Sequence, residues 1–186
     1  MSFFDFKSET HATKLLIADH REVDALFTEF ESADDSAKKA SIVTRICRSL
    51  TVHAEIEEKI FYPESRRVLD KDDQDMVDEA FVEHASLKGL IMRLDGMKPG
   101  DALFGAYVTV LKEYVQHHVK EEESEYFPKV EKTGLDLDAL GARMKTLKDQ
   151  LMAEMSKTPM KRGQVVAKLL PSVSLERRAG LMRKAA

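Results

Sequence analysis

The 186-residue sequence contains one cysteine, Cys47, so no intramolecular disulfide can form and disulfide-stabilised scaffolds are excluded. Glycine and proline are scarce, with eight and five residues, and the alternating Val, Ile and Thr runs typical of strands are nearly absent. No stretch approaches about 18 consecutive apolar residues, so no membrane span is expected. The opening MSFFDFKSET lacks the basic and apolar regions of a signal peptide, and we expect a cytoplasmic protein.

Several functional motifs are also missing. The sequence has no P-loop, no GxGxxG fingerprint, no Ser-His-Asp order and no cysteine-rich zinc pattern. The corresponding nucleotide-binding, hydrolase and zinc-finger classes therefore lack support. With 43% hydrophobic and 33% charged residues, the composition is ordinary for a soluble helical protein.

Charge is distributed unevenly along the chain. Residues 156–186 carry eight Lys or Arg and one Glu, a balance of +7, which leaves −11 for residues 1–155 of a chain whose net charge is −4. We predict an acidic folded body over 1–155 and a basic, flexible tail over 156–186. A solvated tail is the simpler interpretation. Contact with an acidic partner is the alternative, and nucleic acid is not expected.

Five segments place apolar residues at helical spacing. They are residues 11–31, 35–68, 73–94, 101–132 and 136–155. Pro63 is expected to kink the second helix or to end its regular part. Short polar connections, including GMKPGD, separate the first four. The predicted fold is all-α, an up-down-up-down four-helix bundle with an additional C-terminal helix and a basic tail.

A repeat of potential metal ligands runs through the four predicted helices. The stretch HAEIEEKIFYP begins at His53, and HHVKEEESEYFP contains the same pattern from His118, at an offset of 65. A lone histidine precedes each stretch, and the two are offset by 64. The repeated positions are His20, His53 and Glu57 in the first half, and His84, His118 and Glu122 in the second.

The spacing of these residues predicts a shared site. Residues at i and i+4 lie one above the other on a helix, so His53 and Glu57 can point at one site, as can His118 and Glu122. All six residues continue the apolar stripes, which face the bundle interior. Buried polar groups need partners or a metal. Six such ligands suit a dinuclear centre of iron or manganese, with zinc as a further candidate.

Some assignments stay open at this point. His117 with Glu122 is geometrically possible, although the repeat favours His118. Glu58 and Glu123 are expected on the flanks, where they are alternative ligands if the redox state of iron changes. Tyr114, one turn before His118, is expected either to pack in the core or to hydrogen-bond an iron-bound species.

On these motifs the chain resembles the hemerythrin-like HHE cation-binding domain family over about residues 11–132. The resemblance implies a non-haem, oxo- or hydroxo-bridged centre of two iron ions. His20, His53, His84 and His118 would be terminal ligands, and Glu57 and Glu122 would bridge the irons. The chain departs from the oxygen-carrying hemerythrins, which have a fifth histidine where this chain offers Ala80 or Lys88. They also have His-x4-Asp where it has His-x3-Glu.

These departures favour a metal-binding protein that binds or senses O2, NO or peroxide, or that handles iron, as in stress responses. No separate acid–base or nucleophile group is evident, so we do not predict an enzyme. The alternatives are a di-iron enzyme acting on peroxide or NO, iron-centre repair, and a helical interaction protein that uses its basic tail. A monomer and a homodimer are both compatible with the sequence.

Overall fold

The computed structural model describes residues 11–157, and every long element in that part of the chain is an α-helix. Helix α1 spans Ala12–Ser32, α2 spans Ser36–Ile56, α4 spans Lys71–Asp95, α5 spans Phe104–Glu121 and α7 spans Leu137–Lys157. The four-helix bundle with an added C-terminal helix is confirmed. The boundary proposed at 155/156 stays a prediction, and most of the basic tail lies outside the described residues.

Two of the four bundle helices contain a π-helical turn just before a proline. After α2 come the π-turn η1 (Glu57–Phe61) and the short helix α3 (Tyr62–Arg66). After α5 come η2 (Glu122–Tyr126) and α6 (Phe127–Glu131). The ring of Pro63 or Pro128 would collide with the carbonyl four residues earlier in a regular helix, and a widened turn avoids this contact. The regular part of the second helix thus ends at Ile56, ahead of Pro63 as expected, and the helix continues through the π-turn to Arg66.

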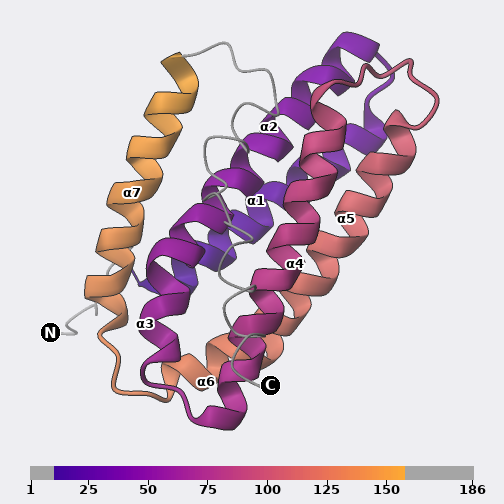
Figure 1. Cartoon of the computed structure of the whole chain (residues 1–186). Coiled ribbons are helices and arrows are strands. Elements are labelled where there is room, and N and C mark those ends of the chain that lie inside the picture. Colours follow the sequence, from indigo (N-terminus) through magenta and orange to yellow (C-terminus); the bar gives the residue numbers. More distant parts are fainter. Residues whose placement is uncertain (1–10, 158–186) are drawn as a thin grey trace, which may run out of the picture.

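The helices run side by side along one bundle (Figure 1). Helix α1 packs on α2, and α4 packs on α5, as expected for antiparallel neighbours joined by short connections. Helix α7 covers α1 and α2 from outside the bundle, where Leu151 and Met155 bury Val52. The fifth helix is therefore packed against the half of the bundle that contains His20 and His53.

Two separate hydrophobic clusters fill the bundle. One includes Phe27, Ile46 and Leu111, and the other includes Leu16, Phe61 and Val130. Cys47 is buried in the first. The repeated histidines lie between the two clusters in sequence on every bundle helix. No helix of residues 11–157 is long and apolar enough to cross a membrane.

Candidate metal centre

The structure brings together all six residues that the repeat singled out. Each is at most 6% exposed, although all six are polar. They are His20 on α1, His53 on α2, Glu57 on η1, His84 on α4, His118 on α5 and Glu122 on η2. All four bundle helices therefore contribute to one interior polar cluster.

The four imidazoles form two pairs that meet through Nε2. The Nε2 atoms of His20 and His53 lie 3.2 Å apart, and those of His84 and His118 lie 3.1 Å apart. Each pair joins the lone histidine of one half of the repeat to the histidine of the His-x3-Glu motif in the same half. Two nitrogen pairs at similar separations are the arrangement expected of two adjacent metal positions.

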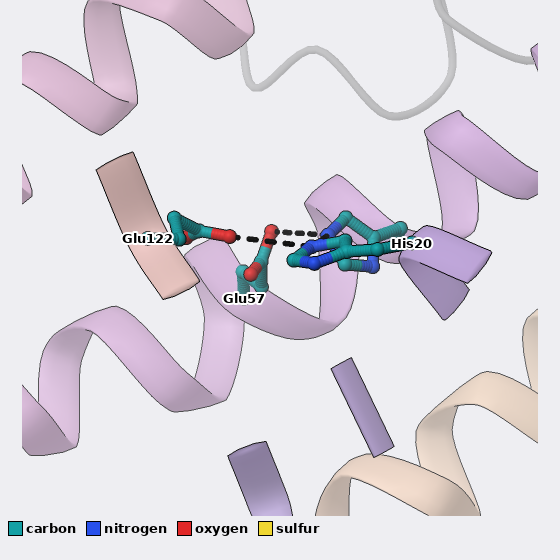
Figure 2. A group of neighbouring side chains, drawn as sticks. His20, Glu57 and Glu122 are labelled. Carbon is teal, nitrogen blue, oxygen red and sulfur yellow. Dashed lines mark hydrogen bonds and ion pairs between the residues drawn. The ribbon is translucent and has the colours of Figure 1, made fainter. Parts of the chain in front are cut away.

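Each glutamate lies between the two pairs. Oε2 of Glu57 is 3.1 Å from Nε2 of His53 and 3.4 Å from Nε2 of His84. Oε2 of Glu122 is 3.4 Å from Nε2 of His20 and 3.5 Å from Nε2 of His118. Figure 2 shows both carboxylates directed at the imidazole side of the cluster. Each carboxylate thus contacts one histidine of each pair, as a bridging ligand would.

The hydrogen bonding of the cluster is incomplete without a cation. Both carboxylate oxygens of Glu57 and Oε2 of Glu122 are buried with no hydrogen-bond partner. Unpaired buried carboxylates are costly. His20, His53, Glu57 and Glu122 place ligand atoms within 4.8 Å of one another, and so do Glu57, His84 and His118. The donor set of four nitrogens and two carboxylates fits two divalent or trivalent metal ions.

The two glutamates have opposite protonation tendencies. Burial and the nearby Glu122 carboxylate raise the pKa of Glu57 well above its ordinary value. Burial also opposes ionisation of Glu122, but His118, His20 and His53 outweigh it and lower the Glu122 pKa. Two carboxylates at one buried site rarely both ionise without a cation. Of the two carboxylates, that of Glu57 is therefore the one whose protonated form is favoured without a cation.

A carboxylate lies beside Nδ1 of every clustered histidine. Glu123 is 2.8 Å from His20 Nδ1, Glu58 is 3.0 Å from His84 Nδ1, Glu83 is 2.7 Å from His118 Nδ1 and Asp19 is 3.5 Å from His53 Nδ1. An ionised carboxylate only accepts hydrogen bonds, so Nδ1 donates and Nε2 keeps its lone pair. This is the tautomer that a metal ligand needs.

Sequence reasoning missed Asp19 and Glu83, although a signal was present. Each directly precedes a lone histidine, so the acidic-His dipeptide repeats at the same offset of 64. Glu58 and Glu123 were expected on the flanks, and they contact the histidines through Nδ1. Helix α7 participates as well, since Lys148 forms an ion pair with Asp19.

The structure separates His118 from its neighbour. The side chain of His118 is 4% exposed and lies inside the cluster, whereas that of His117 is 63% exposed. The expectation for Tyr114 was wrong, because it is 48% exposed and belongs to neither the core nor the cluster. The phenol beside the cluster is that of Tyr62, whose Oη donates to Glu122 Oε1 at 2.9 Å.

A small cavity adjoins the four imidazoles. Its volume is about 20 Å³, and its walls include the four histidines, Lys88 and apolar side chains such as Leu50, Ile91 and Val115. A cavity of about this size holds one water-sized molecule. Lys88, one turn after His84, is 5% exposed and donates to both oxygens of Glu58 at 2.7 Å.

A four-helix bundle whose interior gathers four histidines and two glutamates around unpaired oxygens defines a metal-binding helical protein. The chain belongs to the hemerythrin HHE cation binding domain family, which it matches over residues 11–130. A hemerythrin HHE cation binding domain-containing protein from Mycobacterium kansasii has a solved structure of the same fold, with a TM-score of 0.72 and 19% identity. That alignment covers 86% of this chain and 99% of the other.

Two curated relatives are similar in sequence. A DNA nickase of Nostoc is 31% identical over 121 residues, which are 65% of this chain and 34% of the nickase. A hemerythrin-like protein of Schizosaccharomyces pombe is 25% identical over 123 residues, which are 66% of this chain and 61% of that protein. The chain thus spans about a third of one relative and under two thirds of the other.

Proposed function

We propose that this chain is a non-haem di-iron protein of the cytoplasm that binds or senses a small molecule such as O2, NO or peroxide. The observation that carries the proposal is the position of Glu57 and Glu122, each within 3.5 Å of one histidine from each imidazole pair. His20 and His53 would hold one iron, His84 and His118 the other, and both glutamates would bridge. Manganese and zinc are the substitutes that this donor set accepts.

When bound, the two irons would supply redox chemistry and open coordination positions to a small ligand. The chain's own residues prepare the site for this. Carboxylates at Nδ1 orient each imidazole and increase its basicity, and Tyr62 orients Glu122. The two hydrophobic clusters on either side exclude bulk water, which strengthens every charge interaction inside.

The cavity beside the imidazoles supports a small, weakly polar ligand. Its volume of about 20 Å³ suits a molecule of two or three atoms, and it is walled mainly by apolar side chains. Lys88 is, with Ala80, one of the two positions at which this chain lacks the fifth histidine of the oxygen carriers. Because an ammonium held by Glu58 does not ligate metal, Lys88 would leave a coordination position of the bound metals open to solvent or ligand.

Small-molecule binding can be measured on the iron-loaded protein. We expect NO and peroxide each to change the visible spectrum saturably, and His118→Ala to abolish the response because it removes a terminal ligand. Arg93→Ala, an exposed change on α4, is the matched control. Absence of any spectral response to O2, NO or peroxide in an iron-loaded protein would refute a sensing or binding role.

The enzymatic alternative uses the same centre. Multiple turnover of peroxide or NO by the iron-loaded protein, lost in His118→Ala, would establish a di-iron enzyme in place of a binding protein. Iron-centre repair would be supported by transfer of iron from this chain to a damaged iron–sulfur protein. DNA nicking is the activity named for a relative three times longer than the matched region, and the interior cluster offers no surface for a nucleic-acid strand.

A further inference from the structure

We propose that divalent cations reach the centre through an acidic passage between α4 and α5, with an outer cation-binding station formed by Glu83, His117 and Glu121. This inference rests on the proposed metal centre, because the passage ends there. The occupant is a hydrated divalent cation, Fe²⁺ in the first place, on its way to Glu122 and His118.

Two adjoining pockets form the passage. The inner pocket, of about 70 Å³, reaches His118 and Glu122 at its deep end. The outer pocket is an open depression that also includes His117. Glu79, Glu83 and Glu121 line both pockets, so the two adjoin at these side chains. The passage therefore leads from solvent to a predicted bridging carboxylate.

Its walls are strongly acidic. The carboxylates along the two pockets are those of Asp75, Asp78, Glu79, Glu83, Glu121, Glu122 and Glu125. Among the described residues that line them there is no lysine or arginine. Clefts lined by one sign of charge concentrate ions of the opposite sign and raise association rates. The passage has the charge expected of a cation route.

The outer station has the geometry of a cation site. Nε2 of His117 is 3.5 Å from Glu83 Oε1 and 3.3 Å from Glu121 Oε1, and one ligand atom from each residue lies within 4.8 Å of the others. Imidazole with two carboxylates suits Fe²⁺, Mn²⁺ and Zn²⁺. The exposed position of His117 suits a transient site from which the ion moves inward.

Glu83 differs from the other three carboxylates that face the histidines. Arg21 pairs with Glu123, Lys88 with Glu58 and Lys148 with Asp19. Among the ion pairs of residues 11–157, Glu83 has only His118 and His117 as partners. Its Oε2 contacts the interior histidine while Oε1 faces the outer station. A cation at the outer station would neutralise Glu83, as a basic side chain neutralises each of the other three carboxylates.

The inner end of the passage independently points to a cation. Glu122 is 2% exposed, and its Oε2 has no hydrogen-bond partner. This buried carboxylate lines the inner pocket. A cation that passes the outer station therefore finds an unpaired, buried ligand next.

The other approaches to the centre are less suited to cations. The apolar cavity beside the imidazoles includes the Lys88 ammonium. A third pocket, which reaches His20, is lined by Arg21 and Lys120 together with Asp24 and Glu123. Asp19 balances Lys88 in the first of these pockets, and the third has as many carboxylates as basic side chains. Neither has the excess of carboxylates that attracts cations to the passage, so neutral ligands and cations would use different routes to the same centre.

Metal uptake kinetics test the passage directly. Chelator-treated full-length protein is mixed anaerobically with Fe²⁺, and uptake is followed by protection of the iron from a ferrous chelator. We expect the triple variant Glu79→Gln, Glu121→Gln, Glu125→Gln to load about 10-fold more slowly at low ionic strength. Its final iron content should equal that of the wild type. The difference should shrink at about 1 M salt, where charges are screened within about 3 Å.

Two further variants make the test specific. The triple variant Glu29→Gln, Glu31→Gln, Asp34→Asn removes the same charge from the end of α1 and the connection to α2, and it should load at the wild-type rate. His117→Ala removes a ligand of the outer station without removing a carboxylate, and it should slow loading by itself.

Equal loading rates for the passage variant and the wild type at low salt would overturn the route. A wild-type loading rate in His117→Ala would overturn the outer station. A wild-type protein that takes up no Fe²⁺ at equilibrium would refute the metal centre itself, and the route with it.

Discussion

Tyr62 donates a hydrogen bond from Oη to Oε1 of Glu122 at 2.9 Å, and the Tyr62 Oη also lies 3.3 Å from Nε2 of His84. Tyr62 begins α3 directly after one π-turn, and Glu122 begins the other. The equivalent of Tyr62 in the second half of the repeat is Phe127, whose ring stacks on His20. The repeat is therefore asymmetric at the centre, with a phenol against one imidazole pair and a phenyl ring against the other.

Removing this phenol should weaken metal binding while leaving the fold intact. We expect Tyr62→Phe to lower iron affinity about 10- to 100-fold, because a partner that orients a ligand carboxylate is lost. Competition with a chelator of known affinity measures the iron affinity of the variant and of the wild type. Tyr126→Phe is the control, since that phenol bonds to Ser65 and not to the cluster. Equal losses in the two variants would show that packing, not Glu122, accounts for the effect.

The carboxylates at Nδ1 should matter for metal affinity more than for folding. Glu123→Gln is expected to reduce iron affinity about 10- to 100-fold, because the amide is a weaker acceptor than the carboxylate for His20 Nδ1. Glu113→Gln, on the exposed face of α5, provides the comparison. Anaerobic isothermal titration of the chelator-treated proteins with Fe²⁺ measures both iron affinities. An unchanged affinity in Glu123→Gln would contradict the role assigned to these contacts.

The pair of buried Lys88 and partly buried Glu58 should contribute to stability in a coupled way. Lys88→Met leaves Glu58 without its ammonium partner, and we expect a loss of about 1 to 3 kcal/mol in the free energy of unfolding. The double variant with Glu58→Gln should recover part of that loss, because no unpaired charge remains. Urea denaturation of the four proteins gives the coupling energy. Additive losses would mean that the two side chains act independently.

Glu57 should destabilise the metal-free protein at neutral pH. Its pKa is raised above the ordinary 4.5 by burial and by Glu122, so its contribution is favourable below 4.5 and is lost as the pH rises through the raised value. Glu57→Gln cannot ionise. Without metal it should therefore be more stable than the wild type by about 1 to 3 kcal/mol at pH 7, and similar at about pH 4.

Denaturation of the chelator-treated proteins from pH 4 to 7 measures this difference. The same variant should bind less iron, because it lacks one bridging carboxylate. A stability difference that does not vary with pH would show that Glu57 carries no raised pKa in the folded protein.

The helices and the interior cluster could be predicted because apolar residues at helical spacing indicate which face of each helix is buried. His53, His118 and their glutamates continue apolar stripes at helical intervals, and the repeat at 64 and 65 selects them from other polar residues. Tyr114 was misplaced because the buried stripe on α5 runs through Leu111, Val115 and His118. Tyr114, four residues before His118, already lies at the edge of that stripe.

Other features depend on three-dimensional packing and were not predicted. A π-turn adds one residue to a helix, but η1 begins only at Glu57, so the i, i+4 spacing of His53 and Glu57 is unchanged and gave no sign of it. The phenol of Tyr62 reaches the cluster only because the two π-turn segments lie against each other, with Tyr62 and Tyr126 rings 5.9 Å apart. Such contacts arise between helices and leave no signal within either one.

The most direct test of the metal centre is the iron content of the full-length protein after anaerobic reconstitution, measured by elemental analysis beside a His53→Ala, His118→Ala variant. Two histidine pairs and two shared carboxylates predict about two irons per chain in the wild type and a content near zero in the variant. A wild-type protein that retains no iron, or that retains the same amount as the variant, would contradict a di-iron centre at these residues.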